Sequence, residues 1–412
     1  MREILFISHR IPFPPDRGDK IRSHHILKRL ARLAPVHVAT FADDDADMAE
    51  EVELASTAAS YRLVRRGKPL VLAGVQALAS RQPVSLSAFH DQSLAHYVEQ
   101  VLANHDIGTI FVFSGQMGQY VPASFTGRLI VDFVDVDSAK FEAYGAKARG
   151  VERWVDLREA RMLRDEEGRL ATRADVSLLI SAQEAELFSA RLTPQERATA
   201  DVRVLGNGID SVFFDDSLVT PELVMRDIAG PRLIFTGQMD YAPNIDAVTR
   251  AANRIMPLVR RELPGATFHI VGRKPTEDVE ALHGVNGTHV WGRVDDVRTW
   301  LKAADMAIVP LEIARGVQNK VLEAMAMSLP VVLTSAAATG INAVDGQHFA
   351  IADSDEELAA AICALAHDPR DAAVKGLSAR RFVVEKQSWQ GALAGLPRIV
   401  GPMAARATLD AA

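Results

Sequence analysis

The segment RGVQNKVLEAMAMSLPVVL, residues 315–333, places two charged side chains where a helix begins. Apolar residues recur at helical spacing through VLEAMA, while Lys320 and Glu323 share one face at i, i+3. Pro330 ends the predicted helix, and the VVL that follows indicates a short buried strand. A charged pair at the start of a helix, beside a glycine, favours contact with an anion. A surface ion pair is the alternative.

A second candidate is the loop HRIPFPPDRGDK, which follows a predicted strand that ends at Ser8. Gly18 precedes a helix predicted to start near Lys20, and a glycine there lets an anion approach the N–H groups of the helix start. An ordinary loop that contains a glycine is the alternative. GxGxxG, GxSxG and HExxH motifs are missing from the sequence, and His24 and His25 lack partners at metal-ligand spacing.

The composition is that of a globular protein, with 48% hydrophobic and 24% charged residues. The length of 412 residues favours two domains of about 200 residues each. A formal net charge of -7 argues against a nucleic-acid-binding protein. With Cys363 as the one cysteine, no disulfide framework is expected. The apolar runs at the N-terminus and at 69–79 are too short for a signal peptide or a membrane span, so we expect a cytoplasmic protein.

Short apolar runs alternate with amphipathic stretches, and this series occurs twice along the chain. Strands separated by helices predict parallel sheets with right-handed crossovers, which bind ligands at the carboxyl ends of their strands. The stretch 207–231 between the two series has few periodic signals and predicts a domain boundary. The predicted strands are 3–8, 36–41, 109–113, 128–134, 176–181 and 201–206, then 232–237, 267–272, 289–292, 306–310 and 330–334.

The chain resembles glycosyltransferase family 4, whose α/β GT-B fold has two Rossmann-like, doubly wound domains facing across a cleft. The segments that carry this resemblance are the Gly18 loop, VRVLGNGIDSVFF, LIFTGQMDYAPN, FHIVGR, VWGRVDDV and GVQNKVLEAMAMSLPVVLT. SHRIPFPPDRGDKIRSHH, VDFVDVDSAKFEAY and GVQNKVLEAMA resemble, more closely, bacterial sugar transferases encoded with exopolysaccharide systems. The resemblance implies an N-terminal acceptor-side domain, 1–207, and a C-terminal donor-binding domain, 208–387. It also implies a last helix, 388–412, that packs back on the first domain, with Trp389 as its anchor.

The resemblance also implies roles for individual residues. Glu323 would hold the ribose of a nucleotide-sugar donor, because a carboxylate can accept hydrogen bonds from both hydroxyls of a diol. Lys320 would act in catalysis by neutralising the diphosphate as the sugar–phosphate bond breaks. The further donor contacts that it implies are Gly18, Lys20, Gly237, Gln238, Arg273, Val294 and the backbone of Gly316, Val317 and Gln318.

Two positions depart from the family pattern. The first of two glutamates found in many relatives would fall at Arg315, which cannot accept hydrogen bonds from sugar hydroxyls. Gln238 stands where relatives often carry an arginine that contacts the diphosphate. Neutralisation of the diphosphate would then depend on Lys320, with Arg17, Lys20 or Arg273 beside it.

Two carboxylates in VDFVDVDS, residues 131–138, are the candidates for contact with the acceptor. Asp135 and Asp137 match the Asp-x-Asp motif that binds metal in another class of glycosyltransferases, but GT-B enzymes do not need a metal to hold their donor, so we expect none. At a strand end, either carboxylate would be able to accept the proton of the reacting hydroxyl. A cap for the next helix is the alternative. FADDDAD at 41–47 indicates a solvated acidic loop.

The resemblance therefore implies a retaining transfer from a nucleoside-diphosphate sugar, most simply of the UDP type, to a hydroxyl acceptor. A lipid-linked saccharide in exopolysaccharide assembly is the expected acceptor. The basic and apolar segment 61–83 suits contact with anionic lipid at the inner membrane, although a buried helix between solvated arginines explains it equally well. A sugar-nucleotide epimerase and a non-catalytic nucleotide-sugar-binding protein stay open as alternatives, the second because of Arg315.

Overall fold

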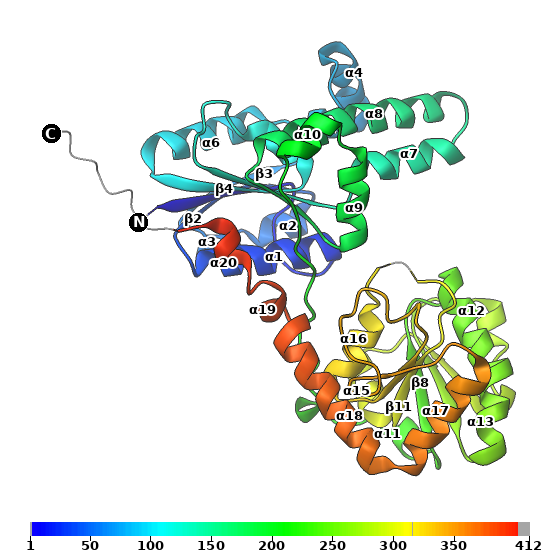
Figure 1. Ribbon diagram of the computed structural model, residues 1–412. Helices are drawn as coiled ribbons and strands as arrows, with labels where there is room; N and C mark the ends of the chain where they lie inside the picture. The colour runs from blue at the N-terminus through cyan, green and yellow to red at the C-terminus, as the bar shows by residue number, and fades with distance from the viewer. Residues whose placement is uncertain (1, 315, 403–412) are drawn as a thin grey trace. The chain divides into compact units, whose positions relative to one another are not determined.

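The computed structural model describes residues 2–314 and 316–402 and divides the chain into two α/β units (Figure 1). Of the described residues, 2–207 and 393–402 form the N-terminal unit, and those between 208 and 392 form the C-terminal unit. Each unit contains a parallel sheet with helices packed against it. The predicted α/β class with two Rossmann-like domains is confirmed.

The sheet of the N-terminal unit has the strand order β3-β2-β1-β4-β5-β6-β7, and its neighbouring strands pair in parallel. The strands are β1 (Glu3–Ser8), β2 (Val36–Ala42), β3 (Ser60–Arg65), β4 (Ile107–Phe113), β5 (Arg128–Val134), β6 (Val176–Leu179) and β7 (Val202–Val204). The helices are α1 (Gly18–Ala31), α2 (Asp45–Ala49), α3 (Glu51–Thr57), α4 (Leu70–Ser80), α5 (Val84–Ala88), α6 (Gln92–Asn104), η1 (Gly115–Tyr120), α7 (Asp137–Lys147), α8 (Gly150–Arg173), α9 (Ala182–Arg191), α10 (Pro194–Thr199) and α20 (Leu396–Val400).

The sheet of the C-terminal unit has the order β10-β9-β8-β11-β12-β13, again with parallel pairs. The strands are β8 (Arg232–Thr236), β9 (Thr267–Val271), β10 (Thr288–Gly292), β11 (Met306–Val309), β12 (Val331–Leu333) and β13 (Ala350–Ile351). The helical segments are η2 (Asp216–Leu218), α11 (Leu223–Arg226), α12 (Ala242–Arg250), η3 (Ala251–Ile255), α13 (Met256–Glu262), α14 (Glu277–Glu280), η4 (Val285–Gly287), α15 (Val297–Ala303), α16 (Asn319–Ala326), α17 (Asp355–His367), α18 (Pro369–Phe382), η5 (Val383–Gln387) and α19 (Trp389–Ala392).

Burial of the strands explains which of them the sequence reveals. Every residue of β2 and β4 is buried, as expected for parallel strands covered by helices on both faces, and such strands are recognisable as apolar runs. β3 was missed because it is the edge strand next to β2, and its polar sequence SYRLVR is only partly buried. β13, with two residues, is too short to leave a pattern.

The end of the chain returns to the N-terminal unit through α20. Leu396, Ile399 and Val400 are buried there, Arg128 Nε donates to Ile399 O at 2.6 Å, and Thr109 Oγ1 donates to Val400 O at 3.3 Å. The return begins at Leu393 rather than at residue 388. Residues 388–392 stay with the C-terminal unit because the backbone at the start of this segment pairs with Ile209: Ile209 N donates to Gln387 O at 2.7 Å and Trp389 N to Ile209 O at 3.3 Å.

Across the described residues, the helices are too short or too polar to cross a bilayer. The end of the predicted segment 388–412, from residue 403 on, lies outside the described residues, as does Arg315.

Candidate functional site

A cavity of about 620 Å³ opens in the C-terminal unit at the carboxyl ends of β8 and β9 and the start of α16. Carboxyl ends of parallel strands are where sheets of this kind bind ligands. The predicted donor contacts that line this cavity are Gly237, Gln238, Arg273, Val294, Val317, Gln318, Lys320 and Glu323. Gly316, also predicted, precedes this lining by one residue along the chain, and its carbonyl accepts from Gln318 Nε2 at 3.1 Å.

Helix α16 holds the two charged residues in place through its buried face. Val321, Leu322, Ala324, Met325 and Ala326 are buried against the sheet, and the helix ends before Pro330, as the pattern predicts. The positions left over at i and i+3 face the cavity, so Lys320 and Glu323 are only half-buried.

Lys320 is held by its surroundings rather than by an acidic partner. Its ammonium donates to Asn244 Oδ1 and lies 4.3 Å from the centre of the Phe235 ring. Asn244 is buried and donates from Nδ2 to Gln238 O at 2.8 Å, which fixes the orientation of its oxygen toward the lysine. Burial lowers the pKa of Lys320 to about 8, although the nearby Glu323 carboxylate favours the charged form.

The carboxylate of Glu323 has unused acceptor capacity. Among the described residues, no side chain or backbone N–H donates a hydrogen bond to it, and burial raises its pKa to about 6 despite the attraction of Lys320. A half-buried carboxylate without a donor is costly in the free protein. It is therefore suited to a ligand that brings hydroxyl groups.

Two glycines let the strand ends β8 and β9 approach one another at the floor of the cavity. A Cβ on Gly272 would lie 1.7 Å from Gly237 O, so an alanine does not fit without moving the backbone. A Cβ on Gly237 would lie 2.9 Å from Asn244 Nδ2 and 3.3 Å from Lys320 Nζ. Gly237 therefore leaves the space that the lysine and the asparagine occupy.

Gln238 and Arg273 contact each other at the rim of the cavity. Arg273 Nη2 donates to Gln238 Oε1 at 2.9 Å, and Gln238 Nε2 donates to Asp240. Gln238 thus positions an arginine from the neighbouring strand end. The lining residues that sequence reasoning missed are Thr236, Tyr241, Asn244, Val271, Gly272, Arg293, Val297 and Asn319. All of them stand within the segments that carried the resemblance, which would have been the signal for them.

In the N-terminal unit, Asp135 and Asp137 lie after β5 at the carboxyl edge of the sheet and share one lysine. Lys140 Nζ is 2.9 Å from Asp135 Oδ2 and 3.1 Å from Asp137 Oδ1. Neither aspartate accepts the capping bonds of α7, whose N-cap position is Val136, so the capping alternative fails for their side chains. Val134 just before them has φ 70°, an unusual conformation for a β-branched residue that costs about 1–3 kcal/mol.

Gly18 is the exposed first residue of α1 with open space around it, as a ligand-approach site requires. Lys20 is placed differently from the prediction. It is buried, and its ammonium bonds to Asp47 and, at 3.0 Å, to Phe13 O. Because both groups already hold the ammonium inside the unit, we leave Lys20 out of the donor contacts.

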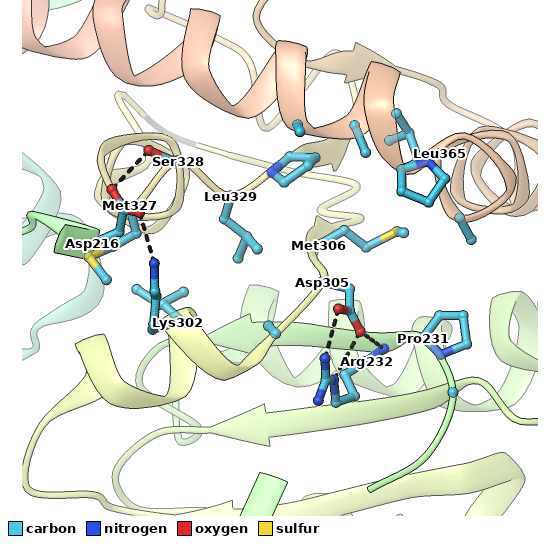
Figure 2. A pocket seen from close by; sticks show the side chains of 18 residues that line it. Asp216, Pro231, Arg232, Lys302, Asp305, Met306, Met327, Ser328, Leu329 and Leu365 are labelled. Atoms are coloured by element: carbon cyan, nitrogen blue, oxygen red, sulfur yellow. Dashed lines mark hydrogen bonds and ion pairs between the residues drawn. The ribbon is translucent and has the colours of Figure 1, made fainter. Parts of the chain in front are cut away.

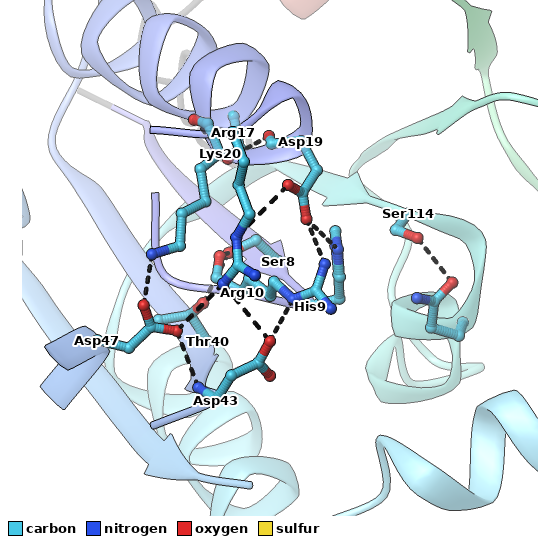
Figure 3. A network of polar contacts seen from close by, with 12 residues as sticks. Ser8, His9, Arg10, Arg17, Asp19, Lys20, Thr40, Asp43, Asp47 and Ser114 are labelled. Carbon is cyan, nitrogen blue, oxygen red and sulfur yellow. Dashed lines mark hydrogen bonds and ion pairs between the residues drawn. The ribbon is translucent and has the colours of Figure 1, made fainter. Parts of the chain in front are cut away.

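A polar network at the carboxyl ends of β1 and β2 was not predicted (Figure 3). Arg10 donates to Asp19 Oδ2 and to Asp43 Oδ2, each at 2.5 Å, and His9 Nε2 lies 3.2 Å from Asp19 Oδ2. Burial raises the pKa of Asp19, but hydrogen bonds from His9 and Arg10 outweigh it and hold that pKa far below its usual range. Asp43 and Asp47 belong to the segment 41–47, so the prediction of a solvated acidic loop is wrong for these two carboxylates.

His9 is the member of this network with an unused polar atom. Its ring is buried and stacks on Phe113 with centroids 5.8 Å apart, and within the described part of the chain its Nδ1 has no hydrogen-bond partner. The signal that would have found His9 is its place directly after the first strand, at the edge where ligands bind.

A second cavity, of about 510 Å³, lies in the C-terminal unit beside the amino-terminal ends of β8 and β11 (Figure 2). Its charged residues pair with one another: Lys302 Nζ is 2.9 Å from Asp216 Oδ2, and Arg232 Nη2 is 2.8 Å from Asp305 Oδ1. Ser328 Oγ donates to Asp216 Oδ1 at 3.0 Å. With its charges satisfied and at the opposite edge from the strand ends that bind ligands, this cavity is not the donor site.

Comparison with known proteins agrees with the geometry. The family model described as Glycosyl transferases group 1 matches residues 230–368, the part that carries the cavity with Lys320 and Glu323. A search of curated proteins found no match.

Solved structures of similar fold cover nearly the whole chain. Sucrose-phosphate synthase (tll1590) from Thermosynechococcus elongatus superposes with a TM-score of 0.57 at 16% identity, covering 97% of this chain and 98% of its own. Alr3699/HepE of Anabaena in complex with UDP superposes with a TM-score of 0.58 at 16% identity, covering 96% of this chain and 98% of its own. WaaG, a glycosyltransferase involved in lipopolysaccharide biosynthesis, superposes with a TM-score of 0.55 at 16% identity, covering 97% of this chain and 100% of its own. Residues 230–368 therefore match a glycosyltransferase group 1 domain, and the chain has the GT-B fold.

Proposed function

We propose that the cavity of the C-terminal unit binds a nucleoside-diphosphate sugar and that the enzyme transfers its sugar to a hydroxyl group. The observation that carries this proposal is the pair on α16, where an ammonium and a carboxylate without a hydrogen-bond donor face one cavity. Lys320 neutralises the diphosphate, and Glu323 accepts hydrogen bonds from the ribose hydroxyls. Arg273 and Arg293 at the rim supply further positive charge.

The donor is of the uridine type in this proposal. Support comes from the similarly folded Alr3699/HepE, whose structures hold UDP and UDP-glucose. The proposal assigns the charge that grows on the leaving phosphate to Lys320 and the rim arginines, in a partly dehydrated site where such contacts are strong.

The reaction proceeds with retention of configuration in this proposal. The acceptor oxygen forms its bond to the anomeric carbon on the face from which the phosphate oxygen leaves, and the acceptor proton passes to that phosphate oxygen. Asp135, Asp137 and His9 are the N-terminal residues proposed to hold the acceptor. All three lie at the carboxyl edge of their sheet, and the buried His9 Nδ1 has no hydrogen-bond partner within the described part of the chain.

The acceptor is a lipid-linked saccharide used in cell-surface glycan assembly, such as an exopolysaccharide. Support comes from WaaG, which has the same fold and is a glycosyltransferase involved in lipopolysaccharide biosynthesis. The proposal further includes peripheral contact with an anionic membrane at the cytoplasmic face. Exposed large apolar side chains gather on α4 and around the turn between α7 and α8: Leu72, Leu78, Tyr144, Val151, Trp154, Val155 and Leu157.

Helix α4 and the turn between α7 and α8 are joined by Arg158, and basic side chains stand among their apolar ones. Arg158 of α8 donates to Ala77 O at 3.0 Å and to Gln82 O at 3.2 Å, so α4 packs beside α8 (Figure 1). Exposed Lys147, Arg149 and Arg153 stand among the apolar residues. An aromatic and aliphatic surface with basic neighbours suits the headgroup region of an anionic bilayer.

Sedimentation with lipid vesicles tests this surface. Trp154→Ala removes a side chain that is 56% exposed and should weaken binding to vesicles that contain phosphatidylglycerol about tenfold. Leu377→Ala, on an exposed position of α18, is the control and should bind like the parent. This part of the proposal is wrong if Trp154→Ala binds the anionic vesicles as tightly as the parent does. It is also wrong if the parent binds neutral phosphatidylcholine vesicles as tightly as the anionic ones.

Incubation with labelled nucleotide sugars, with and without a bacterial membrane extract, tests the function as a whole. Transfer of label to lipid supports the proposal, and transfer should continue in the presence of EDTA. Formation of an isomeric nucleotide sugar without an acceptor would indicate an epimerase instead. Binding without turnover would indicate a nucleotide-sugar-binding protein. A thermal-shift screen selects the donor beforehand, because a ligand of the native state raises its melting temperature.

A further inference from the structure

Three side chains from separate segments of the N-terminal unit converge at the amino-terminal edge of its sheet. Glu3 is the first residue of β1, His37 is the second residue of β2, and His105 follows α6 just before β4. Because β1 pairs in parallel with both β2 and β4, the starts of these strands meet at one edge. Within residues 2–314 and 316–402, this is the one group of three potential metal ligands whose ligand atoms all lie within 4.8 Å of one another.

The distances within this cluster are close to those of a metal site. Glu3 Oε2 lies 2.6 Å from His37 Nε2 and 2.9 Å from His105 Nδ1, and the two imidazole rings are 4.2 Å apart between centroids. Tetrahedral zinc with bonds of about 2.0–2.1 Å places its ligand atoms ~3.3 Å apart. Widening the two contacts by roughly 0.4–0.7 Å therefore admits the ion.

A second observation concerns the partner that orients His37. This side chain is 2% exposed, and its other ring nitrogen, Nδ1, lies 2.7 Å from Ser60 Oγ. Ser60 Oγ is in turn 2.7 Å from Tyr97 OH. Metal-binding histidines commonly bond through the second nitrogen to such a partner, which fixes the ring so that the first nitrogen points at the ion.

We propose that Glu3, His37 and His105 bind a divalent transition-metal ion of the zinc class. Two imidazole nitrogens and one carboxylate oxygen suit zinc, nickel or copper, whereas calcium and magnesium prefer oxygen ligands throughout. The partly exposed His105 and Glu3 give the ion access from solvent, and water completes its coordination. The site lies at the amino-terminal edge of the sheet, opposite the carboxyl edge with the proposed acceptor residues. The ion therefore holds the starts of three strands together and takes no part in sugar transfer.

Metal titration of the full-length protein, without a polyhistidine tag and after dialysis against EDTA, tests this site. Calorimetry with zinc chloride should give one equivalent per chain, and cobalt chloride should produce the visible absorption of tetrahedral Co²⁺. Zinc should also raise the melting temperature. His105→Ala and Glu3→Gln should each lower the zinc affinity by at least tenfold and remove the increase in melting temperature.

Two further variants separate a built site from general binding by surface histidines. His96→Ala removes an exposed histidine of α6, the helix that precedes His105, and should leave zinc binding unchanged. Ser60→Ala keeps all three ligands but removes the partner of His37, and should weaken zinc binding by 10- to 100-fold. No zinc binding by the parent protein would overturn the proposal. So would a zinc affinity that survives both His105→Ala and Glu3→Gln.

Discussion

In the C-terminal unit, the carboxylate of Glu323 accepts no hydrogen bond from a described residue. The ammonium of Lys320 donates to an amide oxygen and lies over an aromatic ring. At the carboxyl edge of the N-terminal sheet, by contrast, Asp19, Asp43 and Asp47 each accept from an arginine or a lysine. One site therefore carries charges that its own unit does not neutralise, while the other carries charges that are already paired.

This difference follows from the ligands that we propose. A nucleoside diphosphate brings its own charge and hydroxyls, so the groups that receive it must be free of internal partners before it binds. A sugar acceptor is neutral at its reacting hydroxyl, so a residue proposed to hold it, such as His9, needs orientation rather than charge, and the paired network orients His9 through Asp19. Substitutions in the first site should change kinetics at constant stability, and substitutions in the second should change stability first.

The largest effect is expected for Lys320→Ala. Loss of the ammonium leaves the growing charge on the leaving phosphate without its main partner, so kcat should fall by about 10²–10³-fold, with a smaller change in the donor KM. Steady-state kinetics with saturating acceptor measures both constants. Lys302→Ala, in the second cavity, is the matched control and should keep its kcat. A loss of less than about threefold in Lys320→Ala would contradict the role given to this residue.

Glu323→Gln should have the next largest effect. The amide keeps the size of the side chain but loses the charge and one acceptor oxygen, which weakens the ribose contact by about 1–2 kcal/mol and raises the donor KM by about tenfold. Glu312→Gln changes an exposed glutamate outside the cavity lining and should match the parent. An unchanged donor KM in a well-folded Glu323→Gln protein would refute the ribose contact.

The pH dependence of donor use should follow the two pKa values of the free cavity. Donor binding needs Glu323 ionised, which fails as the pH falls below its pKa of about 6. It also needs Lys320 protonated, which fails as the pH rises above its pKa of about 8. A plot of kcat/KM for the donor against pH should therefore rise to a plateau and fall again. Lys320→Arg keeps its charge and should shift the alkaline limb to higher pH; a limb that does not move would assign it to another group.

The smallest effect on catalysis, and the clearest on stability, is expected for Asp19→Asn. Hydrogen bonds from His9 and Arg10 hold the pKa of Asp19 below that of the unfolded chain, so its contribution to stability is present at neutral pH and is lost as the pH falls through its folded pKa. Removing the charge should lower the melting temperature at pH 7 by about 2–4 °C, with a difference that shrinks in acid. Glu323→Gln, measured alongside, removes a charge that burial disfavours and should melt at or slightly above the temperature of the parent. If the two variants melt alike, the contrast between the two sites is wrong.

The sequence predicted the elements whose evidence is local and missed those that depend on distant partners. The helix with Lys320 and Glu323 was predicted because its apolar spacing and Pro330 are written within one short segment. Asn244 was missed as the partner of Lys320 because the two are 76 residues apart, and only the fold brings them together. Lys20 was misplaced for the same reason, since its partner Asp47 lies 27 residues further on in a segment that looked solvated.

The return of α20 to the N-terminal unit has a consequence for synthesis on the ribosome. Val400 and Ile399 bond to Thr109 and Arg128, and their side chains are buried in a unit whose other residues end at Asn207. The N-terminal unit begins to emerge first but lacks these contacts until Val400 has been translated. The C-terminal unit, contiguous from Gly208 to Ala392, has all its residues before that point. During translation the C-terminal unit is therefore complete before the N-terminal unit. A premature stop after Ala392 leaves an open apolar surface on the N-terminal unit.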